Sequence, residues 1–161
     1  GGYGGYGEVY GDLWALHLRD DGGFEWEDLT AIVDGTPPPP RFDHHCFKFP
    51  VAPNSTKFDK IIIGGGRDLC QMFHDSYVLD VEKMIWEVDA DPPCLPGQVC
   101  MNLADEVESV PYHKVFSFGG KTDLMMQFTN KIEVMDCGDL KWHEPIVAPG
   151  QFPVPRQDAS Q

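Results

Sequence analysis

Short apolar runs alternate along the chain with clusters of Gly, Pro, Asn and Asp. Clear examples cover residues 61–66, 76–81 and 115–120, where Val, Ile, Phe, Tyr, Ser and Gly dominate. Runs of this length, bounded by turn residues, predict short β-strands. No segment shows the sustained 3.6-residue periodicity of an amphipathic helix. The pattern therefore predicts an all-β chain.

Three segments of the chain repeat one order of landmarks. Each has a glycine pair, an apolar run, a single tryptophan and a proline-containing link. Trp26 and Trp86 lie 60 residues apart, and Trp86 and Trp142 lie 56 apart. In the second segment we expect four strands, at residues 44–49, 60–65, 76–81 and 84–89. In the third, residues 103–110 (LADEVESV) fall where an innermost strand is due, and we expect a distorted strand or loop there.

Each landmark has a physical reason. Two successive glycines remove both Cβ atoms, so that neighbouring backbone can approach closely and positive φ becomes accessible. A tryptophan on an outer strand is large enough to fill the gap between adjacent sheets. A proline fixes a link that cannot join a strand ladder, and an arginine after it can donate to backbone carbonyls of the next unit. The repeat thus predicts sheets that pack one against the next.

This combination resembles the kelch repeat, whose units are about 50 residues long. The resemblance covers residues 4–156 and implies a partial kelch-type β-propeller of four-stranded antiparallel blades. The third unit departs from the pattern at Ile132, where the other units have an aromatic residue, and the second unit ends in Leu-Pro-Gly-Gln instead of Pro-Arg. The residues that carry the match are Gly4, Gly5, Trp14, Trp26, Arg41, Gly65, Gly66, Tyr77, Trp86, Gly119, Gly120, Trp142 and Arg156.

The repeat divides the chain into a partial blade at residues 1–41 that starts mid-blade, a second blade at 42–97 and a third at 98–156. Residues 157–161 are expected to start a further blade or a linker. The opening GGYGG could be a disordered Gly/Tyr tail, but its distance from Trp14 favours the end of a second strand. Propellers close with about four to eight blades, so we expect a segment of a longer propeller, or one that another chain completes.

The chain is acidic, with 12 Lys and Arg against 26 Asp and Glu and a net charge of −14. It has no Lys/Arg cluster, so we expect no nucleic-acid partner, and it has no apolar run long enough for membrane insertion. Basic protein partners, or simple solubility, fit the acidity better. The five cysteines are odd in number and sparse, which favours reduced thiols and a cytoplasmic location.

Candidate chemistry is weak by comparison. His44, His45 and Cys46, taken with His74 and Asp75, lack the spacing of a structural zinc site, so we expect no metal and no cofactor. The prolines at 37–40 could form a polyproline ligand, but they occupy the expected link between units. No Ser/His/Asp or Cys/His nucleophile set stands out, so we expect no enzyme activity in these residues.

The resemblance implies a non-catalytic protein-interaction or scaffold module, part of a larger kelch propeller in a cytoskeletal or ciliary assembly. The alternative is a regulatory or substrate-recruiting propeller of a multidomain enzyme, such as a ubiquitin ligase adaptor or a kelch-containing phosphatase. Partner contacts are expected in the loops between second and third strands, unless these side chains pack between blades. The candidates are Met72, Phe73, His74, Met125, Met126 and Phe128.

Overall fold

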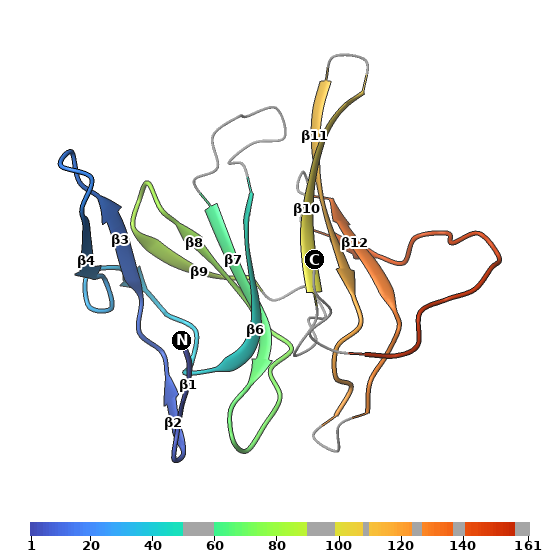
Figure 1. Ribbon diagram of the computed structural model, residues 1–161, viewed down its shortest axis with the longest axis horizontal. Coiled ribbons are helices and arrows are strands. Elements are labelled where there is room, and N and C mark those ends of the chain that lie inside the picture. The colour runs from blue at the N-terminus through green and yellow to red at the C-terminus, as the bar shows by residue number, and fades with distance from the viewer. Residues whose placement is uncertain (50–59, 90–98, 108–109, 124–126, 137–140, 157–161) are drawn as a thin grey trace.

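The computed structural model describes residues 1–49, 60–89, 99–107, 110–123, 127–136 and 141–156. Their secondary structure consists of β-strands joined by turns and loops, which confirms the all-β prediction (Figure 1). The strands are β1 (Gly2–Gly5), β2 (Glu8–Tyr10), β3 (Trp14–Leu18), β4 (Phe24–Asp28), β5 (Asp34–Gly35), β6 (Phe42–Phe49), β7 (Lys60–Arg67), β8 (Ser76–Asp80), β9 (Ile85–Asp89), β10 (Val99–Val107), β11 (Val110–Phe118), β12 (Ile132–Asp136) and β13 (Lys141–His143).

The second unit is the most complete sheet. Its strands pair antiparallel in the order β6-β7-β8-β9, as the sequence predicts, and β5 adds to the outer edge by pairing parallel with β9. Because β5 belongs to the link from the first unit, the chain closes the exposed edge of β9 before it enters the second sheet. Covering an edge in this way blocks unwanted strand pairing.

The third unit has the same order, β10-β11-β12-β13. Its first strand differs from the expectation of a distorted strand or loop. The ladder between β10 and β11 runs without a register shift from the Val99–Phe118 pair to the Val107–Val110 pair. Pairing with β11 supplies the backbone hydrogen bonds, and this tertiary context outweighs the weak strand pattern of the acidic sequence.

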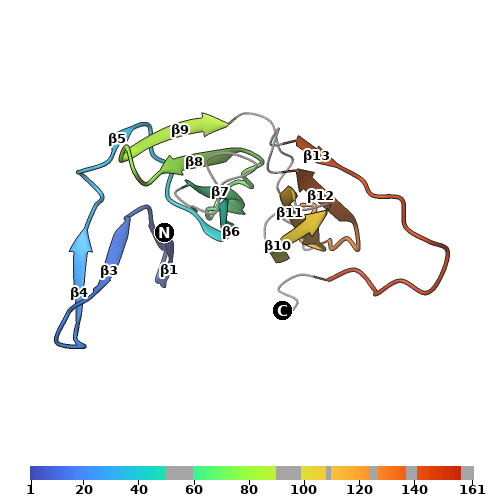
Figure 2. The same ribbon diagram turned by 90° about the horizontal axis from the view of Figure 1, so that it is seen from above.

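The first unit is only partly formed. β3 and β4 make a two-stranded sheet, and β1 and β2 make a separate hairpin. Figure 2 shows the three units side by side in an arc, with β6 and β10 on its inner side and β4, β9 and β13 on its outer side. This arrangement is that of neighbouring blades in a β-propeller.

The strand registers show that the repeat is real in three dimensions. Trp26 lies opposite Leu16, Trp86 opposite Leu79, and Trp142 opposite Met135. The three tryptophans therefore occupy equivalent places on successive sheets. Trp14 and Tyr77 each lie two residues before the residue that pairs with the tryptophan of their unit. In the third unit this position is Glu133 and not Ile132, because the preceding loop is longer there.

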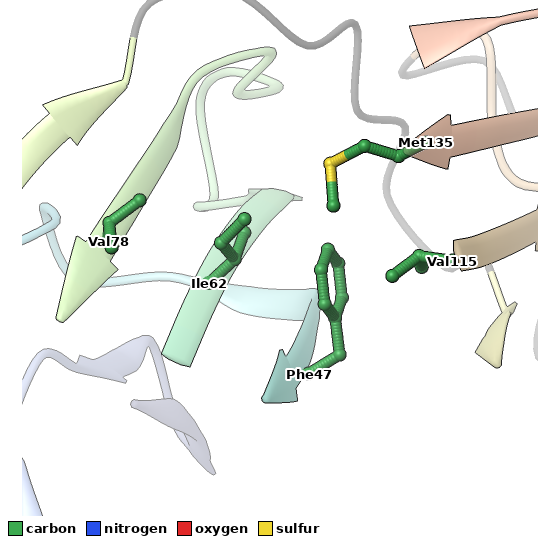
Figure 3. Packing of buried hydrophobic residues seen from close by; sticks show 5 residues of the cluster. All are labelled: Phe47, Ile62, Val78, Val115 and Met135. Atoms are coloured by element: carbon green, nitrogen blue, oxygen red, sulfur yellow. The ribbon is translucent and has the colours of Figure 1, made fainter. Parts of the chain in front are cut away.

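Two apolar clusters lie between the sheets. One joins the second and third units through Phe47, Ile62, Val78, Val115 and Met135, with Trp142 packed against them (Figure 3). The other has Tyr77, Leu79 and Trp86, with Ile61 and Ile63 of the same sheet and Leu13 and Val33 of the first unit against them. Successive residues of a strand point to opposite faces, so β8 contributes to both clusters and is buried on both sides.

Candidate functional site

The joint between the first and second units centres on Arg41. Its guanidinium is buried, and its Nη1 donates to the Gly65 carbonyl at 2.9 Å and to the Asp75 carboxylate at 2.6 Å. The guanidinium carbon lies 4.3 Å from the centre of the Phe73 ring and 5.3 Å from that of Tyr77. The link arginine thus bonds a carbonyl of the next unit, as the sequence suggests, and a carboxylate and two aromatic rings complete its environment.

The glycine pairs make equivalent backbone contacts, the first glycine in all three units and the second glycine in the first and third. The nitrogen of the first glycine bonds the carbonyl just before the third strand, in the pairs Gly1 to Asp12, Gly65 to Asp75 and Gly119 to Lys131. The second glycine nitrogen bonds an arginine carbonyl, in the pairs Gly2 to Arg41 and Gly120 to Arg156. By both contacts, the glycine pair of the first unit is Gly1 and Gly2.

This assignment differs from the prediction, which chose Gly4 and Gly5. These two residues lie further along β1, in the hairpin that follows the glycine pair. The opening tract holds two glycine pairs, and the loop before the third strand varies in length between units. Spacing alone cannot separate the two pairs, whereas hydrogen bonding does.

The joint between the second and third units carries charge at one end. Asp43 Oδ2 accepts from Arg67 Nε at 2.8 Å and from Lys121 Nζ at 3.2 Å. Burial acts to raise the pKa of Asp43, but the hydrogen bonds from Arg67 and Lys121 hold it below its usual value. Lys121 is itself buried, so this ion cluster ties β6 to the loop of the next sheet. This ion cluster was not predicted, because nothing in the sequence brings residues 43 and 121 together.

His45 lies in the same joint. Its ring stacks on Phe47 with 5.8 Å between centroids, and neither ring nitrogen has a hydrogen-bond partner within the described structure. Burial lowers the pKa of His45 to about 3, and repulsion from His44 and Arg41 adds to the effect. A histidine in this setting stays neutral at physiological pH.

The residues considered for a metal are not brought together. His44 and His45 are successive on β6, so their side chains lie on opposite faces of the sheet. Asp75 is bound by Arg41, and His74 is exposed. The described part of the chain contains no group of three or more His, Cys, Asp or Glu side chains placed to hold a metal ion.

The candidate partner loops leave one edge of the three sheets, the lower edge in Figure 1. In each, a pair just after the glycine pair closes a hairpin: Tyr3 with Val9, Arg67 with Met72, and Lys121 with Phe128. Among the predicted contact residues, His74 and Phe128 are exposed and Met72 is half-buried. Met125 and Met126 lie outside the described residues.

Phe73 has a different role from the one predicted. It is buried beneath Arg41, so it belongs to the joint between units, which was the alternative for these loop residues. Two exposed apolar residues of the same loops, Tyr6 and Leu69, were not predicted. In the sequence, each could have been recognised as an exposed contact candidate because it is an apolar residue within a short turn.

Within the described ranges, no helix is long and apolar enough to cross a membrane.

Comparison with known proteins agrees with this geometry. Residues 107–148 match the family model described as the kelch motif. The chain is 54% identical over 160 residues, 99% of its length, to the dynein alpha chain of the flagellar outer arm of Chlamydomonas reinhardtii. It is 26% identical over 121 residues, 74% of its length, to a probable serine/threonine-protein kinase of Dictyostelium discoideum. It spans only 4% and 8% of these two relatives. The match over the third unit and the equivalent tryptophans on three successive sheets agree: the chain belongs to the kelch-repeat family and folds as part of a β-propeller.

Proposed function

We propose that this chain is a non-catalytic protein-interaction module, part of a kelch propeller in a ciliary or flagellar dynein assembly. The support for the setting is the identity of 54%, which extends along nearly the whole chain, to a segment of a flagellar outer-arm dynein chain. The aligned stretch of 160 residues includes the surface loops as well as the core positions that any kelch unit needs. The proposed location is therefore the cilium or flagellum.

The observation that carries the interaction role is the common edge from which the three loops leave (Figure 1). The base of each loop is held by a hydrogen-bonded glycine pair, and each loop carries an exposed apolar side chain: Tyr6, Leu69 or Phe128. Loops fixed on a rigid scaffold are the usual place for binding residues. Exposed apolar side chains gathered at one edge form a surface that a partner would cover.

Leu69→Asp tests this proposal. Leu69 is 54% exposed, so the variant should fold normally and lose partner contacts at the loop edge. The control is Val81→Asp, which makes the same kind of change in the exposed turn between β8 and β9, at the opposite edge. Both variants are introduced into the protein that carries this chain, in ciliated cells, and contacts are mapped by crosslinking and mass spectrometry.

The expected result is loss of crosslinks from residues 67–74 in the Leu69 variant and their retention in the Val81 variant. If both variants keep every crosslink, or if only the Val81 variant loses them, the loop edge is not the binding surface. Circular dichroism of both variants provides the check on folding.

A second candidate is a regulatory propeller within a multidomain enzyme. The observation that favours it is the similarity to a segment of a probable protein kinase. The complete reading frame separates the two: a kinase or phosphatase domain on the same chain supports regulation, and further kelch units beside motor-type sequence support the scaffold.

A further inference from the structure

The tip of the β1–β2 hairpin lies against the loop between β7 and β8, at the lower edge of the sheets in Figure 1. Tyr6 and Gly7 form the tip, and a Cβ at residue 7 would be 3.8 Å from Leu69 Cδ1. Tyr6 is fully exposed, and more than half of Leu69 is exposed. Residues 6–8 and 68–69 of two neighbouring units therefore form one surface, here called the loop patch.

The backbone gives no reason for a tyrosine at the hairpin tip. Tyr6 and Gly7 are the two central residues of the turn between the paired Gly5 and Glu8, with φ of 51° and 89°. Turns with two positive φ values favour Asn, Asp or Gly, and an aromatic residue there is strained. Packing does not compensate for the strain within the described structure, because the Tyr6 side chain is fully exposed. A residue placed against its local backbone preference indicates a contact made outside the fold.

The loop patch carries negative charge. Glu8 is the only charged residue of the β1–β2 hairpin, and its carboxylate accepts from the Tyr10 hydroxyl at 2.8 Å. The Asp68 carboxylate accepts from the backbone nitrogens of Cys70 and Gln71, and these bonds lower the pKa of Asp68, so that it stays charged at neutral pH. Both carboxylates are therefore bonded by neutral donors, and neither has a cation of the described residues as its partner.

The cations nearest to the loop patch are engaged elsewhere. Arg67 donates through Nε to Asp43 at 2.8 Å, and Lys121 bonds the same carboxylate and is only 3% exposed. The turns at the opposite edge of the sheets instead present Arg19 and Lys83, whose side chains are 54% and 68% exposed. The loop patch thus offers acids and apolar side chains, whereas the opposite edge offers both signs of charge.

We propose that the loop patch binds a basic segment of another protein, in which Lys or Arg side chains lie beside apolar ones. This inference rests on the proposed function and adds the chemistry of the partner. The carboxylates of Glu8 and Asp68 pair with the cations, and the exposed ring of Tyr6 offers a cation–π contact. Apolar side chains of the segment cover Leu69. The net charge of −14 favours the same partner, because it speeds the encounter with a basic surface and repels an acidic one.

The occupant is identified by photocrosslinking in the intact protein that carries this chain, in ciliated cells. A benzophenone amino acid replaces Tyr6, which keeps an aromatic ring at this position. Crosslinked proteins are digested with a protease that does not cleave at Lys or Arg, and the attached peptide is sequenced. The expected peptide comes from another protein and carries Lys or Arg beside apolar residues. A peptide without Lys or Arg, or one from a kelch unit of the same protein, overturns the proposal.

The charge is tested with the double variant Glu8→Gln and Asp68→Asn, which keeps oxygens that accept from Tyr10 and from the backbone. The matched control is Asp20→Asn with Glu82→Gln, at exposed turns of the opposite edge, which alters the net charge by the same amount. The yield of the benzophenone crosslink should fall several-fold in the loop variant, the loss expected for two exposed ion pairs, and stay unchanged in the control. Equal yields in the parent and both variants, or an equal fall in both variants, overturn the proposal.

The basic partner and the interaction role fail separately. Leu69→Asp tests whether any partner contacts the loop edge, whereas the neutral variants test the charge of that partner. Crosslinks that do not depend on Glu8 and Asp68 would overturn the basic partner and leave the interaction role standing. Absence of every benzophenone crosslink would also overturn the basic partner, and the interaction role falls with it only if the Leu69 variant keeps all its crosslinks.

Discussion

Because His45 is buried as a neutral ring, we expect the joint between the second and third units to weaken in mild acid. The side chain is buried, stacked on Phe47 and without a hydrogen-bond partner in the described structure, and burial lowers its pKa to about 3. In the unfolded chain the pKa of a histidine is about 6.5. Below that pH the unfolded chain takes up a proton that the folded protein refuses. Stability contributed by the neutral ring is therefore complete above pH 6.5 and is lost as the pH falls toward 3.

The magnitude follows from the separation of the two pKa values. Each pH unit below about 6.5 costs about 1.4 kcal/mol in the free energy of unfolding, so the loss between pH 7 and pH 5 is about 2 kcal/mol. Burial also lowers the pKa of His44, which adds to the slope in the same window. The carboxylates whose pKa is lowered, such as Asp43, lose their contribution only at more acidic pH.

The measurement is urea unfolding followed by tryptophan fluorescence at several pH values between 5 and 7. His45→Phe keeps a ring on Phe47 and removes the titrating group, so its stability should fall less steeply, by about 1.4 kcal/mol per pH unit relative to the parent. His45→Leu serves as a second apolar variant in case the larger ring disturbs folding. His74→Phe is the control, since His74 is exposed. Parallel pH dependences for the parent and both His45 variants would refute the reasoning.

Two further predictions concern the joints and the glycine pairs. Arg41→Gln removes the buried guanidinium that bonds the Asp75 carboxylate and the Gly65 carbonyl, and because Asp75 is 35% exposed it should lower the free energy of unfolding by about 1.5–3 kcal/mol. Arg156→Gln, at an exposed site, should change it little in the isolated chain. Urea unfolding of both variants measures the difference, and equal effects would contradict the role of Arg41. Gly66→Ala places a side chain at φ +84°, against the backbone of β6, and should destabilise by more than about 1 kcal/mol; Gly150→Ala, which meets no neighbour, should be close to neutral in the same assay.

The sequence predicted the repeated strands well because each strand is specified locally. Apolar runs bounded by turn residues place β7, β8 and β9 close to their observed limits. The tryptophans give a second signal, since each has one fixed partner across the outer strand pair. Where the local signal was weak, as in the acidic residues of β10, pairing with the neighbouring strand determined the structure.

The errors arose where loop length varies. The glycine pair of the first unit was placed at Gly4 and Gly5 instead of Gly1 and Gly2, and the aromatic position of the third unit was placed one residue before Glu133. Both were counted across the loop between second and third strands, which differs in length between the units. Contacts between units, such as Asp43 with Lys121, could not be predicted, because they depend on how two sheets face each other.

The two joints hold neighbouring sheets by different means, and the acidity of the chain explains why cations matter to both. With 26 acidic and 12 basic side chains, most charges repel one another, and self-repulsion opposes close packing of the sheets. The chain places buried cations where sheets meet: Arg41 at the first joint and Lys121 at the second. Each bonds a carboxylate of the neighbouring unit, and an apolar cluster accompanies the ion pair at both joints. The third unit has Lys131 where the second has Asp75, and it meets the second sheet through Met135, Trp142 and the pair of Lys121 with Asp43.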